Sequence, residues 1–321
     1  MSRHVPMGPG AEFDAVRALL AQWGTAAEGV GDDGAVLDVP SGSRLVVSTD
    51  TTVEDVHFRR SWLSAEEIGW RATQAALSDL AAMGASPLGV LLALTVPVNW
   101  REDLSALADG IAAATRSARA PIVGGDVTAG DRLALAITVL GHAKRPLSRA
   151  GARAGDTLYL TGALGGPGAA LAAWESGTTP SAAARARFAK PIARIAAGEW
   201  LAAHGATAAI DLSDGLAGDV AHLAAASGVH CVLELDAIPC VAGIDVGAAL
   251  ASGEEYELLI AAPGLDTQAF AAAHDGLSLT AVGRIERANG APGARNVTAE
   301  RAGRPTALPT ALPRAHDHFA A

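Results

Sequence analysis

Residues 65–85 read AEEIGWRATQAALSDLAAMGA, with apolar side chains recurring at helical spacing. The spacing predicts a helix over residues 65–83. At about 100° per residue, Asp79 falls on the same face as Ile68 and Ala72, inside the apolar stripe. A buried ionised carboxylate is costly unless a metal ion, a cation or main-chain amides compensate it. We favour metal binding for Asp79, with a structurally satisfied carboxylate as the alternative.

The chain around this helix alternates short apolar runs with alanine-rich helical stretches. In the first half, the predicted strands are residues 45–47, 89–96 and 133–140, and a second helix covers residues 103–118. Basic residues, a proline and glycines break the pattern over residues 143–156, which indicates a domain boundary.

The second half of the chain repeats the alternation. Its predicted strands are residues 157–161, 208–212, 232–235, 256–261 and 279–285, and its predicted helices are residues 168–173, 192–204 and 215–226. We therefore expect an α/β (α+β) fold of two domains, residues 11–146 and 147–321, after a flexible N-terminal extension of residues 1–10.

Length and composition exclude several classes of protein. The 321 residues suit two domains, and a net charge of −10 argues against a nucleic-acid partner, which requires a basic surface. No apolar run approaches the roughly 20 residues of a spanning helix, so we expect no membrane partner. The N-terminus lacks the apolar stretch of a signal peptide, which favours a cytoplasmic location. Cys231 and Cys240 lack metal- or redox-site spacing and are predicted to be packing residues.

Acidic residues recur beside predicted strand ends and glycine turns. Gly31-Asp32-Asp33-Gly34 is equally consistent with a turn and with a metal site, while Ser48-Thr49-Asp50 directly follows a predicted strand. Asp126 follows Gly124-Gly125, where main-chain amides have room to approach a phosphate. In Asp211-Leu212-Ser213-Asp214-Gly215, Ser213 suits either an anion site or a helix N-cap.

Two common nucleotide-binding motifs are excluded. Neither lysine of the chain, Lys144 or Lys190, lies in a G-x-x-x-x-G-K-[ST] sequence, so there is no P-loop. Residues 162–168, GALGGPG, follow a predicted strand but lack the spacing of a dinucleotide-binding fingerprint. A tight strand-to-helix turn is the interpretation we favour for that segment.

Taken in order, these motifs resemble those of the thiamine-monophosphate kinases, within the aminoimidazole-ribonucleotide-synthetase-like superfamily. The resemblance spans nearly the whole chain. It also includes Val56-His57-Phe58, Arg149 and Gly253-Glu254-Glu255-Tyr256-Glu257-Leu258. The family pattern Gly-Gly-Glu-Asp-Tyr-Glu appears here with Ser252 and Glu255, and a substrate-stacking aromatic of the family falls at Pro313.

The resemblance implies a two-domain fold whose N-terminal sheet pairs across a homodimer. It implies transfer of the γ-phosphoryl group of ATP to thiamine monophosphate by direct in-line displacement, with several Mg²⁺ ions. Another ATP-using member of the superfamily and a non-catalytic nucleotide- or metal-binding protein are the alternatives.

The resemblance also implies roles for individual residues. Asp126 and Arg149 are the implied catalytic residues. The implied metal ligands are Asp33, Ser48, Thr49, Asp50, Asp79, Asp126, Asp211 and Asp214; the implied ATP contacts are Gly125, Asp126, Arg149 and Ser213; and the implied substrate contacts are His57, Glu254 and Phe319. Without the resemblance, His57 is equally well explained as an ordinary loop histidine.

Overall fold

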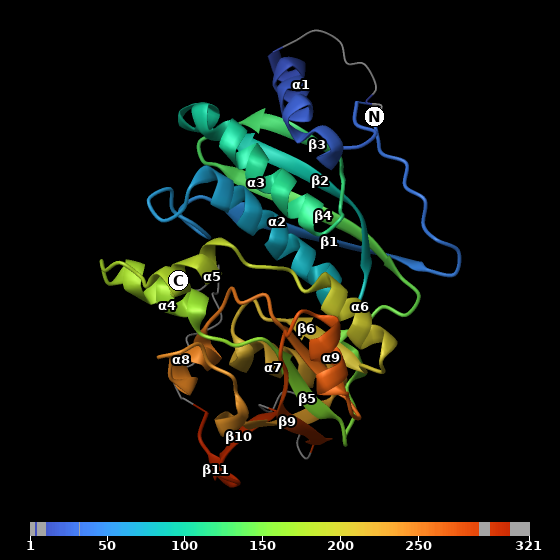
Figure 1. Ribbon diagram of the computed structural model, residues 1–321, viewed down its shortest axis with the longest axis vertical. Coiled ribbons are helices and arrows are strands. Elements are labelled where there is room, and N and C mark those ends of the chain that lie inside the picture. The colour runs from blue at the N-terminus through green and yellow to red at the C-terminus, as the bar shows by residue number, and fades with distance from the viewer. Residues whose placement is uncertain (1–3, 5–10, 32, 289–295, 309–321) are drawn as a thin grey trace. The chain divides into compact units, whose positions relative to one another are not determined.

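The computed structural model describes residue 4 and residues 11–31, 33–288 and 296–308. The chain forms two compact units, each described here by itself (Figure 1). Unit 1 comprises Met1–Leu80, Ala85–Lys144 and Ala189–Ala193, and unit 2 comprises Ala81–Gly84, Arg145–Phe188 and Arg194–Ala321. Within the described residues, no helix is both long and apolar enough to cross a membrane.

Unit 1 is built on a four-stranded sheet in the order β1-β4-β2-β3. Strands β2 and β3 are parallel, and the other neighbouring pairs are antiparallel. The strands are β1 (Arg44–Val53), β2 (Ser86–Val96), β3 (Ile122–Ala129) and β4 (Ala134–Ala143), and the helices are α1 (Ala11–Trp23), α2 (Ala65–Ala82) and α3 (Leu104–Ser117), with 3-10 turns at Gly24–Ala26 and Val98–Asp103.

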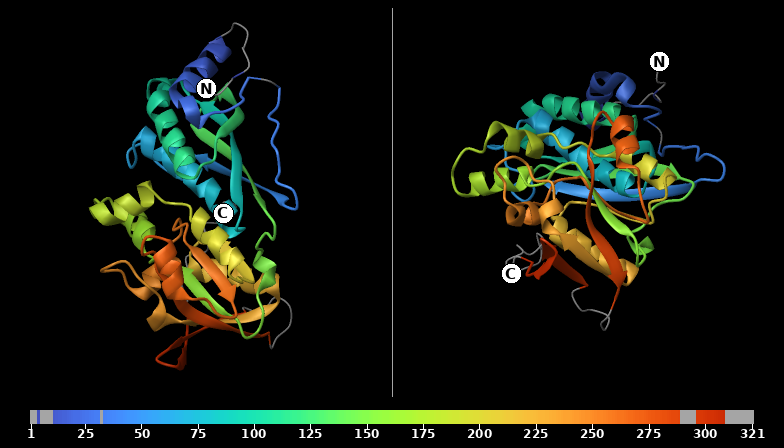
Figure 2. Two further views of the ribbon diagram at one scale, coloured as in Figure 1. Left: turned by 45° about the vertical axis from the view of Figure 1, so that its right-hand side comes forward. Right: turned by 60° about the horizontal axis from the view of Figure 1, so that its bottom comes forward.

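The helices α2 and α3 lie over one face of this sheet (Figures 1 and 2). Alternate side chains of the strands, such as Leu92 and Ile137, are buried on that face. On the opposite face Leu45 is 51% exposed and Val47 is 54% exposed. Within the described part of unit 1, α2 and α3 therefore cover one face of the sheet, and Leu45 and Val47 lie on the other.

Two strands extend further than the sequence indicated. The predicted strand at residues 45–47 is the start of β1, which runs to Val53, so Ser48, Thr49 and Asp50 lie inside the strand and not after it. Likewise β3 continues to Ala129 and contains Asp126. Both strands keep pairing through these polar residues because main-chain hydrogen bonds to β4 and β2 do not depend on the side chain.

Unit 2 holds a seven-stranded sheet in the order β11-β10-β7-β9-β5-β8-β6. Its strands are β5 (Thr157–Thr161), β6 (Ala208–Asp211), β7 (Val229–Glu234), β8 (Leu258–Ala262), β9 (Leu279–Arg287), β10 (Val297–Arg301) and β11 (Arg304–Thr306). Its helices are α4 (Gly166–Glu175), α5 (Ala182–Ala189), α6 (Ile195–Ala203), α7 (Leu216–Ser227), α8 (Val246–Ala251) and α9 (Thr267–Ala273), and a 3-10 turn covers Arg149–Gly151.

Both faces of the larger sheet are covered. Leu160 of β5 packs in one core cluster with Leu223 of α7, whereas its neighbour Tyr159 packs in another with Leu201 of α6 and Phe270 of α9. Successive side chains of the strand point to opposite faces of the sheet and therefore pack into two separate cores. Cys231 is fully buried in the first cluster and Cys240 packs against it, as expected for packing residues. The predicted two-domain α/β architecture is confirmed.

Candidate active site

In unit 1, the structure brings two of the acidic motifs together. Ser48 and Asp50 alternate with Thr49 along β1, and the Ser48 hydroxyl donates a hydrogen bond to Asp79 Oδ2 at 2.5 Å. Asp79 is half-buried near the end of α2, although neighbouring residues of that helix are fully buried. Asp79 therefore has a polar partner from a strand 31 residues away, on the helix face that the sequence had marked as apolar.

The side chain of Thr49 lies on the other face of the sheet. Its hydroxyl accepts a hydrogen bond from Thr138 at 3.0 Å, across the β1–β4 pair. The structure therefore separates the Thr49 side chain from Ser48 and Asp79, and any metal contact of Thr49 would use its main-chain carbonyl. Asp33 is exposed in the segment before β1, and Asp32 lies outside the described residues.

Gly125 and Asp126 lie side by side on the edge strand β3. They border a small pocket of about 40 Å³ whose other lining residues are mostly apolar side chains of α1, β2 and β3. Asp126 is exposed there. A Cβ atom on Gly125 would come within 2.0 Å of the Leu92 carbonyl oxygen, so strand pairing itself requires a glycine beside this carboxylate.

The ring of His57 has a defined orientation. Its Nδ1 accepts a hydrogen bond from the Val53 main-chain N–H at 3.1 Å. A neutral imidazole whose Nδ1 accepts must carry its proton on Nε2. The half-buried ring of His57 therefore presents Nε2 as a hydrogen-bond donor, which suits contact with an anion.

In unit 2, Asp211 is the last residue of β6 and only 5% exposed. The residues after it form a turn into α7, whose N-cap is Gly215 with φ 106° and no side-chain cap. Ser213 is exposed and does not cap the helix, so the capping alternative is wrong. Its hydroxyl remains available to a ligand in that turn.

A third acid, Asp219, lies close to Asp211 and Asp214 and was not predicted from the sequence. We call these three residues the acidic cluster of unit 2. Asp219 is 2% exposed in the first turn of α7, and it accepts a hydrogen bond from the Asp214 main-chain N–H at 3.3 Å. Burial, then the charges of Asp214 and Asp211, raises the pKa of Asp219 to about 8, while Arg149 opposes that rise. Arg149 is thus close enough to influence these acids.

Glu254 is joined to this cluster by main-chain hydrogen bonds. We call residues 252–257 the glutamate loop. The Glu254 N–H donates to the Ser213 carbonyl at 2.7 Å, and the Tyr256 N–H donates to the Leu212 carbonyl at 2.9 Å. The Tyr256 hydroxyl donates to Glu254 Oε2 at 2.5 Å. The predicted substrate contact and the predicted ATP contact are therefore adjacent, whereas Phe319 and Pro313 lie outside the described residues.

Comparison with known proteins identifies the family. The model for the AIR synthase related protein N-terminal domain matches residues 31–143, and that for the C-terminal domain matches residues 153–291. Thiamine-monophosphate kinase from Salmonella typhimurium is 36% identical over 290 residues, 85% of this chain and 87% of the relative. The chain belongs to the thiamine-monophosphate kinase family. The predicted family resemblance is thereby confirmed.

Solved thiamine-monophosphate kinases share the whole fold. The crystal structure from Stenotrophomonas maltophilia K279a has a TM-score of 0.78 at 32% identity and covers 94% of this chain and 98% of that one. AaThiL complexed with AMPPCP and TMP has a TM-score of 0.71 at 26% identity, with 91% and 94% covered. The hydrogenase maturation protein HypE in complex with ATP, at 21% identity and a TM-score of 0.76, shares the fold.

The acids of this kinase fit divalent cations that are only partly held by protein. Among the described residues, no three His, Cys, Asp or Glu side chains are grouped to hold a metal ion by themselves. Mg²⁺ usually keeps several waters and takes one or two carboxylates plus substrate phosphates. Burial is the main cause of the raised pKa of Asp219, and the charges of Asp214 and Asp211 add to it. A cation beside these three acids would offset their negative charge.

Proposed function

We propose that this chain phosphorylates thiamine monophosphate with ATP and releases thiamine diphosphate and ADP. Family membership supports the reaction, and AaThiL was solved with AMPPCP and TMP. The observation in this chain that carries the proposal is the hydrogen bond from the Glu254 N–H to the Ser213 carbonyl. It sets a residue implied to contact the acceptor directly beside one implied to contact ATP.

The reaction needs positioning and charge neutralisation more than a strong base. A phosphate acceptor is already ionised near neutral pH, and phosphoryl transfer proceeds through a transition state with negative charge on the transferred oxygens. Bound Mg²⁺ supplies neutralisation of that charge. Arg149 supplies a guanidinium beside the acids of unit 2, and His57 supplies an Nε2–H donor in unit 1.

Ligand roles are assigned to residues of both units. In unit 1, Mg²⁺ is bound by the Thr49 carbonyl and by the side chains of Asp33, Ser48, Asp50, Asp79 and Asp126. ATP is contacted by Gly125 and Asp126, and thiamine monophosphate is contacted by His57. In unit 2, Asp211 and Asp214 bind Mg²⁺, Arg149 and Ser213 contact ATP, and Glu254 and Phe319 contact thiamine monophosphate. The Ser48–Asp79 hydrogen bond and the Asp211–Asp214–Asp219 cluster support the two halves of this assignment.

The protein acts as a homodimer in this proposal. The face of the unit 1 sheet that carries Leu45 and Val47 is not covered by helices α2 and α3, and both side chains are about half exposed. Apolar sheet surface of this kind is favourably buried against a second copy. A cytoplasmic location is part of the same proposal.

The decisive experiment is incubation of the purified chain with ATP, Mg²⁺ and thiamine monophosphate, and with each component omitted in turn. Thiamine esters and nucleotides are separated by chromatography. We expect equal amounts of thiamine diphosphate and ADP only when all three components are present. ATP binding without either product would overturn the proposal.

A further inference from the structure

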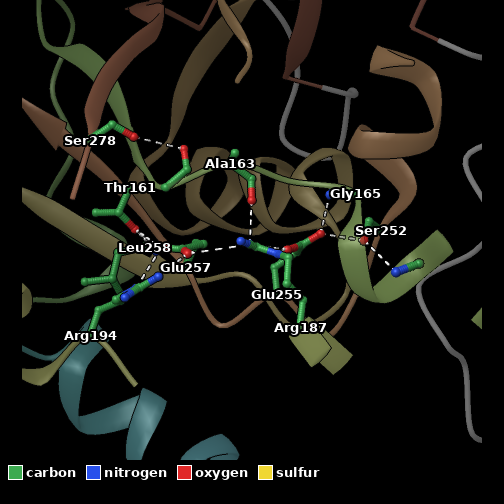
Figure 3. Close-up of polar contacts among 12 residues, drawn as sticks. Thr161, Ala163, Gly165, Arg187, Arg194, Ser252, Glu255, Glu257, Leu258 and Ser278 are labelled. Carbon is green, nitrogen blue, oxygen red and sulfur yellow. Dashed lines mark hydrogen bonds and ion pairs between the residues drawn. The ribbon is translucent and has the colours of Figure 1, made fainter. Parts of the chain in front are cut away.

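The glutamate loop carries a second acid, Glu255, that has no part in the roles assigned above. Its side chain is fully buried, although it neighbours Glu254 in sequence. Figure 3 shows it among polar groups from three parts of unit 2: the turn before α4, the helix α5, and Ser252 of its own loop. A buried carboxylate with this many partners fixes the conformation of the segment that carries it.

Glu255 and Ser252 form one hydrogen-bonded unit. The Ser252 hydroxyl donates to Glu255 Oε1 at 2.6 Å, and the same oxygen accepts from the Gly165 N–H at 2.5 Å. Ser252 Oγ in turn accepts from the Gly168 N–H at 2.9 Å. The pair thus joins the glutamate loop to the first turn of α4 through two main-chain amides. Ser252 and Glu255 are also the two positions where this chain departs from the family pattern.

The glycine-rich turn leaves space for these side chains. A Cβ atom on Gly168 would lie 2.8 Å from Ser252 Oγ, and one on Gly162 would lie 2.4 Å from Glu257 Oε1. Gly162 and Gly168 therefore leave room for side chains of the glutamate loop. Arg187 of α5 completes the contact, with an N–H donating to Glu255 Oε2 at 3.1 Å and to the Ala163 carbonyl at 2.5 Å.

The conformation that this contact holds is an unfavourable one. Glu254 has φ 62° and Tyr256 has φ 54°, both in the left-handed region that residues other than glycine rarely occupy. Such residues persist only where the surrounding structure determines them. Burial raises the pKa of Glu255, opposed by its bonds from Ser252, Gly165 and Arg187, so the same contacts that hold the loop also compensate the buried acid.

We infer that Ser252 and Glu255 are positioning residues that hold Glu254 in place for the phosphate acceptor. The inference rests on the proposed function, in which Glu254 contacts thiamine monophosphate. Because the anchored segment is the acceptor side of the site, loss of the anchor affects acceptor binding more than ATP binding.

The test compares Ser252→Ala, Glu255→Ala and the double variant in steady-state kinetics with ATP and thiamine monophosphate varied separately. We expect each single variant to raise the KM for thiamine monophosphate about tenfold, since small displacements of positioning groups are costly, and to leave the KM for ATP within about threefold. The double variant should fall short of the product of the two single effects, because both remove the same hydrogen bond. Glu300→Ala, which removes an acid of the same unit from its ion pair with Arg284, is the matched control and should leave both KM values unchanged.

A merely structural role would lower the melting temperature and the active fraction while leaving both KM values of the folded protein unchanged. That result in Ser252→Ala overturns the inference, and it does so even if Glu255→Ala fails to fold. Wild-type protein that forms no thiamine diphosphate refutes the proposed function instead. The Ser252→Ala variant therefore tests the inference, and the wild-type protein separately tests the proposed function.

Discussion

Replacing Arg194 with methionine removes the main partner of a buried carboxylate. Arg194 donates to both oxygens of Glu257, at 2.9 and 2.5 Å, and Glu257 is 1% exposed. Breaking a buried pair by removing one partner costs about 3–5 kcal/mol. Thr161 still donates to Glu257 at 2.7 Å and Arg187 remains at 3.7 Å, so we take the lower end, about 3 kcal/mol. For a domain of this size, that lowers Tm by about 6–12 °C.

The assay is thermal unfolding of Arg194→Met beside Arg284→Met. Arg284 forms ion pairs with Glu234, Glu286 and Glu300, but its side chain is 41% exposed. Exposed pairs contribute little, so this control should lose less than about 1 kcal/mol. The number of ion pairs alone would predict the opposite result, a larger loss of stability for Arg284→Met than for Arg194→Met. Adding Glu257→Gln to Arg194→Met should recover part of the loss, because the buried group is then neutral. A Tm for Arg194→Met within about 1 °C of wild type would refute the reasoning.

The other predictions concern the site, the assembly and the cysteines. Asp79→Asn and Asp126→Asn should each reduce turnover below about 1% of wild type with Tm largely retained, because charge neutralisation at the phosphoryl group is lost; near-normal turnover in both would contradict the metal assignment. Val47→Arg, on the uncovered sheet face, should convert a dimer to a monomer in light scattering, whereas a wild-type monomer would refute the dimer. Burial raises the pKa of the Cys231 thiol to about 12, so at pH 8 an alkylating reagent followed by mass spectrometry should label Cys240 and spare Cys231 until the protein is unfolded; labelling of both at one rate would count against this.

Several helices and fully buried strands could be predicted from the sequence, although the helix α1, Ala11–Trp23, was not predicted. The predicted helix at residues 65–83 corresponds to α2, Ala65–Ala82, and the strand at residues 157–161 matches β5. Strands that carry polar residues could not be delimited. The apolar run of β1 stops at Val47, yet its pairing continues to Val53 through main-chain bonds that leave no periodic signal in the side chains. The helices α5, α8 and α9 were not predicted, because they are too short to show a periodic pattern of apolar residues.

The candidate site was partly predictable for a physical reason. A carboxylate inside an apolar helical stripe marked Asp79, and the structure gives it Ser48 as a partner. Asp219 also lies inside an apolar helical stripe, three residues after Leu216 and four before Leu223, and could have been identified in the same way. What no pattern could supply is the hydrogen bonding between the glutamate loop and Leu212–Ser213, since those segments are about 40 residues apart and meet only through the fold.

The glycine-rich turn at residues 162–168 resembles a phosphate-binding loop in sequence but contacts side chains of the protein itself. Glycines that admit a phosphate and glycines that admit a neighbouring side chain look alike in a sequence, because both remove a Cβ from a crowded backbone. A Cβ on Gly162 would meet the carboxylate of Glu257, and the Gly165 N–H is already donated to Glu255. An amide that is bound to a buried carboxylate cannot also bind a phosphate. The turn therefore contacts the glutamate loop, and the proposed nucleotide contacts are Gly125, Asp126, Arg149 and Ser213.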